Sequence, residues 1–316
     1  MARIDILLAT YNGGRFLAQQ LQSLTDQTCD DWRLIVRDDG SNDDTLVVLG
    51  EWAERTGAEM MLLEDGETGC GACENFARLL AASDAPYFAF CDQDDVWKPE
   101  KLFRLLTALQ DAEREHASAL PMLAFCDLVP VTEQLEPISN SFRAFCGLSI
   151  PSPARMAGHL MLQNVVTGCA MMGNAALRDT VGTVPSAAMM HDWWLALVAA
   201  TMGQIVDVPD ALVLYRQHGA NAIGARRSTL TDHALRFARE PLVNFRHARD
   251  WVQGASRQSA VFANTYRGRL DDDIFGLYRS FGEARQHGFV RRKLFPIRHH
   301  AQSNSLARIV AASIFL

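Results

Sequence analysis

Three carboxylates follow a run of apolar and aromatic residues in the segment FAFCDQDDVW, residues 88–97. Alternate residues of an extended chain face the same side, so Asp92 and Asp94 are expected to point toward one ligand. Oxygen ligands beside a phosphate-binding site are typical of Mg²⁺ or Mn²⁺. The alternative is a structural one, in which Asp94 or Asp95 lies at the positive N-terminus of a helix with Pro99 in its first turn.

Short β-rich runs alternate with helical patterns in the first half of the chain, which predicts βαβ units and a mostly parallel sheet. The expected strands are residues 4–10, 33–38, 60–64 and 87–92, and the expected helices are residues 15–24, 43–55 and 73–83. Ser41 or Asn42 is the expected N-cap of the second helix.

Polar segments follow three of these expected strands: TYNGG after the first, DDGSND after the second and DQDD after the fourth. Open α/β sheets bind ligands outside the carboxyl ends of their strands. We therefore expect the three segments to gather on one edge of the sheet and to form the ligand site there.

FAFCDQDDVWKPEKL resembles the metal-binding signature of the inverting family-2 glycosyltransferases of the GT-A fold. LLATYNGGRFLAQQLQSLTDQT resembles the first strand and helix of this family, and LIVRDDGSNDDT resembles its nucleotide-binding turn. HDWW and YRQHGANAIGA resemble later signatures of its rhamnosyltransferase-like branch, and together these segments cover about residues 3–225. The resemblance implies an α/β protein with a Rossmann-like mixed, mostly parallel sheet flanked by helices. Residues 1–225 would form the catalytic domain and residues 226–316 a basic helical C-terminal appendage.

The resemblance assigns the nucleotide to a group of residues near the first two strands. Asp38 and Asp39 would hold the nucleobase and ribose, since carboxylates accept hydrogen bonds from a base N–H or a ribose hydroxyl. Thr10 and Tyr11 match the nucleoside-contacting segment, and Asn75 lies where the family contacts the nucleotide again. The structural alternatives are an Asx-turn at the DDGS segment and ordinary strand-end packing of the aromatic ring.

The resemblance also implies a divalent-cation site. Asp92 would hold the ribose or the metal, and Asp94 would hold the Mg²⁺ or Mn²⁺ that bridges the donor diphosphate. His218 matches a position at which the family often places a further metal or diphosphate ligand. A lone histidine is more often structural, and it is the nearby carboxylates that favour a ligand role here.

Asp192 in the segment MMHDWW matches the general base of the family, which takes the proton from the acceptor hydroxyl. The apolar neighbours Trp193 and Trp194 are expected to raise its pKa and could form a sugar or acceptor platform. The alternative is that Asp192 is a helix N-cap. Many relatives carry an acidic residue where this chain has His191, which is the less favoured base.

Two smaller motifs have weaker interpretations. Gly168 and Cys169 fall where the family shapes the acceptor side of the pocket, although a plain tight turn explains them equally well. Cys70 and Cys73 form a CxxC motif without a second pair or a nearby histidine, so we interpret it as incidental rather than as a zinc or redox site.

The net charge of −7 conceals an asymmetry. Residues 226–316 contain 16 Lys and Arg against 7 Asp and Glu, whereas residues 1–225 contain 14 against 30. A basic segment ending in the apolar stretch SLARIVAASIFL is either a helical appendage packed on the catalytic domain or a contact with an anionic membrane. Nucleic acid is not expected, because no stacking aromatics alternate with the basic residues.

Seven scattered cysteines and the absence of an apolar run of about 20 residues indicate a cytoplasmic protein.

These features together predict a metal-dependent inverting glycosyltransferase of polysaccharide biosynthesis, such as that of O-antigen or capsule. The expected donor is a dTDP- or UDP-sugar, with dTDP-rhamnose as the first candidate, and the expected acceptor is a saccharide or a lipid-linked sugar. One alternative is a sugar nucleotidyltransferase, although NGGR is not followed by the Gly-x-Thr-Arg run of such enzymes. Another is a non-catalytic carbohydrate-binding scaffold on the same fold.

Overall fold

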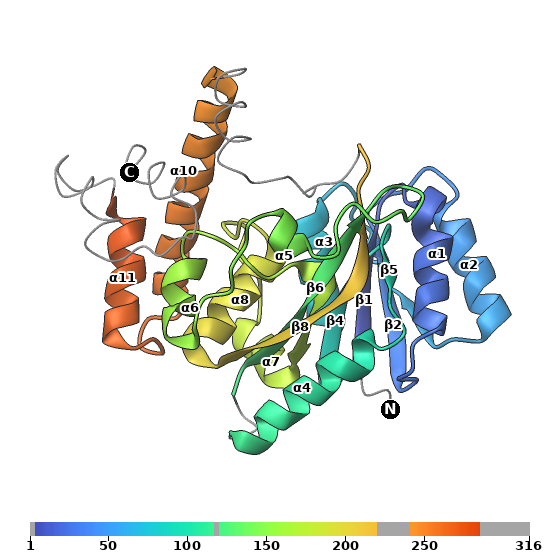
Figure 1. Ribbon diagram of the computed structural model, residues 1–316, viewed down its shortest axis with the longest axis horizontal. Coiled ribbons are helices and arrows are strands. Elements are labelled where there is room, and N and C mark those ends of the chain that lie inside the picture. The colour runs from blue at the N-terminus through green and yellow to red at the C-terminus, as the bar shows by residue number, and fades with distance from the viewer. Residues whose placement is uncertain (1–3, 117–119, 220–240, 285–316) are drawn as a thin grey trace.

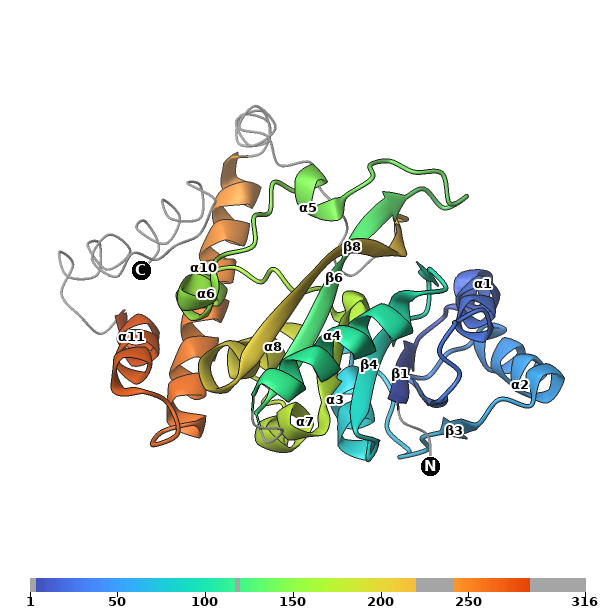
Figure 2. The ribbon, with the colours of Figure 1, turned by 60° about the horizontal axis from the view of Figure 1, so that its bottom comes forward.

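The computed structural model describes residues 4–116, 120–219 and 241–284. These residues form one mixed, mostly parallel sheet of eight strands in the order β3-β2-β1-β4-β7-β6-β8-β5, with helices packed around it (Figures 1 and 2). The predicted boundary between residues 225 and 226 and the basic, apolar C-terminal segment lie outside the described residues.

The first half of the chain forms the parallel part of the sheet as predicted. β1 lies between β2 and β4 and is parallel to both, and β3 is added parallel to β2. Its elements are β1 (Ile4–Thr10), α1 (Gly14–Thr25), β2 (Trp32–Asp38), α2 (Thr45–Thr56), β3 (Met60–Leu62), α3 (Ala72–Ala82) and β4 (Tyr87–Asp92). Apolar side chains on both faces of β1 and β4 are buried, as in a sheet covered by helices on both sides.

The second half of the chain adds β7, which is antiparallel to both β4 and β6, and β8, which is parallel to β6. Its elements are β5 (Val96–Trp97), α4 (Lys101–Glu115), β6 (Met122–Val131), α5 (Phe142–Phe145), α6 (Pro153–Leu160), a 3₁₀ turn (Gly168–Ala170), β7 (Met171–Asn174), α7 (Ala175–Val181), α8 (His191–Met202) and β8 (Gln204–Arg216).

The predicted N-cap of α2 is wrong, and the structural alternative for the acidic cluster is also excluded. α2 begins at Thr45 with Asp44 at its N-cap, and the Ser41 hydroxyl that was predicted to cap it donates a hydrogen bond to Asp38 instead. α4 begins only at Lys101, because the residues after the acidic cluster form β5. The alternative in which Asp94 or Asp95 caps this helix therefore does not hold.

Two C-terminal helices, α10 (Pro241–Thr265) and α11 (Asp272–Gly282), share one hydrophobic core with the sheet domain. The rings of Trp194 and Phe262 are 5.2 Å apart, and the Tyr278 hydroxyl donates to the Ala157 carbonyl at 2.7 Å. α10 thus packs against α8 (Figure 1). Among the described residues, no helix has both the length and the apolar character needed to cross a bilayer.

Candidate active site

The carboxyl ends of β1, β2 and β4 meet at one edge of the sheet, as predicted. The strand register aligns Thr10 with Asp38 and places Asp92 beside the last residues of β1. Gln93 joins two of the polar segments, because its side-chain oxygen accepts the Tyr11 N–H at 2.9 Å and its amide donates to the Tyr11 carbonyl at 3.0 Å. The TYN and DQDD segments are therefore held side by side.

Asp38 organises the turn that follows β2. One carboxylate oxygen accepts hydrogen bonds from the hydroxyls of Thr10 at 2.7 Å and Ser41 at 2.6 Å. The other accepts the backbone N–H groups of Gly40 and Ser41. This is the turn-forming arrangement that the sequence left open as the alternative, and it fixes the turn beside Tyr11, whose side chain is 55% exposed.

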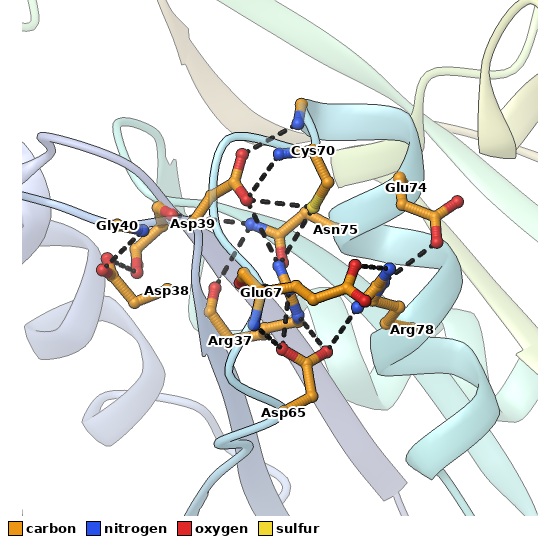
Figure 3. Close-up of polar contacts among 12 residues, drawn as sticks. Arg37, Asp38, Asp39, Gly40, Asp65, Glu67, Cys70, Glu74, Asn75 and Arg78 are labelled. Atoms are coloured by element: carbon orange, nitrogen blue, oxygen red, sulfur yellow. Dashed lines mark hydrogen bonds and ion pairs between the residues drawn. The ribbon is translucent and has the colours of Figure 1, made fainter.

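Asp39 is buried and anchors the loop that precedes α3 (Figure 3). Its Oδ1 accepts the N–H of Cys70 at 3.0 Å and the Cys70 thiol at 2.9 Å, whereas its Oδ2 accepts the N–H of Gly71 at 2.8 Å. Burial opposes the charged form, but these hydrogen bonds outweigh it and lower the pKa of Asp39. The carboxylate is therefore ionised and fixed in direction.

Arg37, which sequence reasoning missed, is the centre of this network (Figure 3). Its fully buried guanidinium donates to both oxygens of Asp65 at 2.9 and 2.8 Å and to Asn75 Oδ1 at 3.2 Å. The Asn75 amide in turn donates to the Arg37 and Thr10 carbonyls. Asn75 therefore joins β1 to β2, and Arg37 fixes Asn75 and the loop. The sequence signal that could have identified it is the position of Arg37 directly after the apolar residues LIV of the second strand.

Asp94 and His218 meet although they lie 124 residues apart, with 2.7 Å between Asp94 Oδ2 and His218 Nε2. Arg216, also missed from the sequence, holds this corner together. Its Nε donates to the Asp94 carbonyl at 2.7 Å, and its backbone N–H donates to Asp95 Oδ1 at 3.1 Å. The His218 ring lies 4.9 Å from the Phe16 ring. A carboxylate oxygen and an imidazole nitrogen thus meet beside the end of β4.

A second group of possible ligands lies deeper. Asp92, Asp95 and Cys169 each place a ligand atom within 4.8 Å of the others, the one such group found among the described residues. Burial, with the nearby Asp94 and Asp192 carboxylates, raises the pKa of Asp92 to about 7. Asp95 and Cys169 are almost completely buried, and a thiol is a poor ligand for Mg²⁺. Asp94 and His218 are more accessible, with 18% and 10% of their side-chain surfaces exposed.

Lys101 supplies a positive charge beneath these carboxylates. Its ammonium is completely buried, donates to the Cys169 carbonyl at 2.6 Å and lies 3.0 Å from the centre of the Trp97 ring. Burial lowers the pKa of Lys101 to about 8. This charge partly compensates the cost of burying the Asp92 and Asp95 carboxylates.

Asp192 lies in the first turn of α8, whose N-cap is Met190, so it is not the cap. Its Oδ2 accepts the Gly168 N–H at 2.9 Å, and its Oδ1 accepts the Asn164 amide at 3.2 Å and the Trp193 N–H at 2.5 Å. Burial raises the pKa of Asp192 to about 7, a value suited to a general base near neutral pH.

The tryptophan pair that follows Asp192 does not form the sugar or acceptor platform that was expected. Trp193 and Trp194 are 5% and 0% exposed and pack against C-terminal helix α10, so they do not form an open sugar platform. His191 is stacked on Phe76, and burial lowers its pKa to about 3. An imidazole with so low a pKa is a weak base, which favours Asp192 for that role.

Gly168 lies against His191 and Asp192 in the first turn of α8. A Cβ built on it would be 2.9 Å from His191 Nε2 and 3.6 Å from the Asp192 Cβ. Since the Gly168 N–H also holds Asp192, the absence of a side chain permits the close approach that makes this hydrogen bond possible.

Comparison with protein families gives a match to the model described as Glycosyl transferase family 2, over residues 5–170. An uncharacterized glycosyltransferase of Nostoc sp. is 27% identical over 229 residues, which are 69% of this chain and 66% of that protein. The dTDP-rhamnosyl transferase RfbG of Shigella flexneri is 32% identical over 105 residues, 32% of this chain and 36% of that protein. The chain thus spans less than two thirds of the length of these curated relatives.

Solved structures with the same fold include residues 1–349 of Staphylococcus aureus TarS in complex with UDP-GlcNAc. The TM-score is 0.59 at 14% identity, covering 99% of this chain and 88% of that one. The mannosyltransferase PcManGT of Pyrobaculum calidifontis, in complex with GDP-Man and Mn²⁺, gives a TM-score of 0.56 at 15% identity, covering 99% and 86%. These likenesses confirm the predicted GT-A type fold.

Proposed function

Because the chain belongs to glycosyl transferase family 2, we propose that it transfers a sugar from a nucleotide-sugar donor to a hydroxyl of a saccharide or lipid-linked acceptor. The observation that carries this proposal is the meeting of Asp94 and His218 at 2.7 Å, on the sheet edge that also presents Asp38 and Asp39. Residues 1–225 would be the catalytic domain and residues 226–316 an appendage fixed to it through α10.

The divalent cation of the proposed reaction would be held by Asp94 and His218, with Asp92 beside them. When bound, it would stabilise the negative charge of the departing nucleoside diphosphate. An imidazole ligand suits Mn²⁺ better than Mg²⁺, which prefers oxygen ligands alone. We therefore expect Mn²⁺ to support donor binding at lower concentration than Mg²⁺.

Asp192 would act as the general base of an inverting transfer. As the acceptor oxygen forms its bond to the anomeric carbon, the bond from that carbon to the diphosphate oxygen breaks, and the hydroxyl proton passes to the Asp192 carboxylate. Attack from the face opposite the leaving group inverts the anomeric configuration. The raised pKa of Asp192, about 7, supports this role.

The nucleobase would lie against Tyr11 and the Asp39 carboxylate, with Thr10, Asp38 and Asn75 shaping this end of the site. Asp39 Oδ2 accepts one hydrogen bond, from Gly71, and so retains capacity for another. Thymine, uracil and guanine each offer a ring N–H to such an acceptor, whereas adenine and cytosine do not. We propose a dTDP- or UDP-sugar, with dTDP-rhamnose as the first candidate because of the likeness to RfbG.

Thermal denaturation in the presence of nucleoside diphosphates tests this proposal, since a ligand that binds the native state raises the melting temperature. We expect dTDP or UDP with Mn²⁺ to stabilise the protein and ADP and CDP to have little effect. Chelation should remove the stabilisation. Equal effects of all nucleotides would reject base recognition by Asp39. Binding without turnover of any donor would favour the scaffold alternative.

We further propose that the protein acts in polysaccharide biosynthesis at the inner face of the membrane, where the basic residues of 226–316 would contact anionic lipid. The excess of 16 basic over 7 acidic residues supports this, since each Lys or Arg near such a surface contributes about 1 kcal/mol. The full chain should sediment with anionic vesicles at low salt, and less as salt increases. Failure to sediment at low salt would reject the membrane contact.

A further inference from the structure

Asn164 lies in the segment between α6 and the 3₁₀ turn, and its side-chain amide is fixed at both ends. The amide nitrogen donates to the Val166 carbonyl at 2.7 Å, and the amide oxygen accepts the Val166 N–H at 3.0 Å. These two contacts leave one amide hydrogen, which is directed to Asp192 Oδ1 at 3.2 Å. The Asn164 side chain is therefore a preoriented hydrogen-bond donor to the Asp192 carboxylate.

The 3₁₀ turn that follows this segment holds Asp192 by its other oxygen, since the Gly168 N–H donates to Oδ2. In the part of the chain that the structure describes, Asn164 is the one side chain with a recorded hydrogen bond to this carboxylate. The charge of Asp192 acts electrostatically on Cys73 of α3 and Asp92 of β4, and the preceding residue, His191, is kept neutral by burial. None of them supplies a positive charge.

We propose that Asn164 is a positioning residue for sugar transfer, which orients the Asp192 carboxylate toward the acceptor and favours its ionised form. The inference rests on the proposed function of Asp192 as the general base. A donor hydrogen bond to a carboxylate stabilises the charged state, so its loss shifts the group toward the protonated state. Loss of the bond also allows the carboxylate to rotate away from the direction of attack, and both effects reduce the rate of transfer.

Two substitutions separate this role from that of a turn-forming residue. Asn164→Ala removes the donor. Asn164→Asp has nearly the same shape and keeps the acceptor for the Val166 N–H, but it replaces the donor with a second negative charge. The matched control is Asn174→Ala, because Asn174 is a buried asparagine whose side-chain hydrogen bonds, which cap α7 and contact Met122 N, do not involve Asp192.

The first measurement is a pH titration of the ¹³C-labelled carboxylate of Asp192, assigned by its absence in Asp192→Asn. We expect its pKa to rise by about one unit in Asn164→Ala and by more in Asn164→Asp, the range expected for one hydrogen bond to a charged group. Asn174→Ala should leave this pKa unchanged even if it melts earlier. Equal pKa values in all folded variants would overturn the proposal, and this readout does not depend on whether a donor is turned over.

The second measurement is the pH dependence of transfer. In Asn164→Ala we expect kcat to fall about tenfold, with the acid limb displaced to higher pH and donor affinity preserved. A change in the affinity for donor with an unchanged acid limb would make Asn164 a structural residue of the turn. If the carboxylate titrations change as expected but the wild-type protein transfers no sugar, the proposed function fails and the hydrogen-bond assignment survives.

Discussion

Asp192→Asn is expected to lower the rate of transfer severely and, at alkaline pH, to stabilise the fold. Burial raises the pKa of this carboxyl from its ordinary value of 3.8 to about 7. The ionised side chain is therefore held in the folded protein at a cost in stability. A general base must be ionised to accept a proton, so a catalytic role explains why this cost in stability is tolerated. A side chain that only supported the fold would not need to be ionised.

The size of the effect follows from the pKa. The shift from 3.8 to about 7 corresponds to about 4 kcal/mol, an upper limit for the stability gained when the neutral Asn replaces the carboxylate. Because the folded-state pKa is raised, this gain is complete only above pH 7, shrinks as the pH falls and disappears near pH 4. Loss of a positioned base lowers the rate by about 10² to 10⁴.

One assay tests the effect on stability, and a second tests the effect on catalysis. Unfolding in denaturant at pH 5 and pH 8 should show the Asn variant more stable than wild type chiefly at pH 8. The kcat/KM of the wild type should fall about tenfold per pH unit below about 7, whereas donor binding by the variant should persist. A variant that is destabilised at pH 8 and still active would identify Asp192 as a structural residue and refute this reasoning.

Three further substitutions, the last with a matched control, have distinct expected outcomes. Asp94→Ala should lose the Mn²⁺ dependence of nucleotide binding, measured by calorimetry, without a lower melting temperature, because the side chain lies at the rim of the sheet. Gly168→Ala should lower kcat at least tenfold while nucleotide binding survives, since the new Cβ would lie 2.9 Å from His191 Nε2. Arg37→Met should weaken nucleotide binding and lower stability by about 3 to 5 kcal/mol, whereas Arg78→Met, whose side chain is partly exposed, should change stability by about 1 kcal/mol or less. Equal effects of these two Met variants would show that Arg37 does not organise the site.

The parallel strands and their polar ends were predictable because both leave a local pattern in the sequence. Asp38 and Asp92 follow β-rich runs, and the parallel register places the ends of those strands together. The pairing of Asp94 with His218 could be expected only from the family resemblance, because no local pattern joins residues so far apart.

The supporting residues could not be predicted in the same way. Arg37, Arg216 and Lys101 are long basic side chains that are ordinarily exposed, and their burial depends on carboxylates and carbonyls contributed by distant segments. Capping was also mispredicted at α2, since the Ser41 hydroxyl accepts the Asn12 N–H and donates to Asp38, and these contacts prevail over the local helix signal.

The anomeric configuration of the product tests the central claim most directly. A time course of dTDP- and UDP-sugars with an acceptor saccharide and Mn²⁺ can be followed by ¹H NMR. We predict that the donor anomeric signal disappears, that a product signal of inverted configuration replaces it, and that chelation or Asp192→Asn stops the reaction. A product of retained configuration, or unchanged turnover in excess chelator, would contradict a metal-dependent inverting transfer with Asp192 as the base.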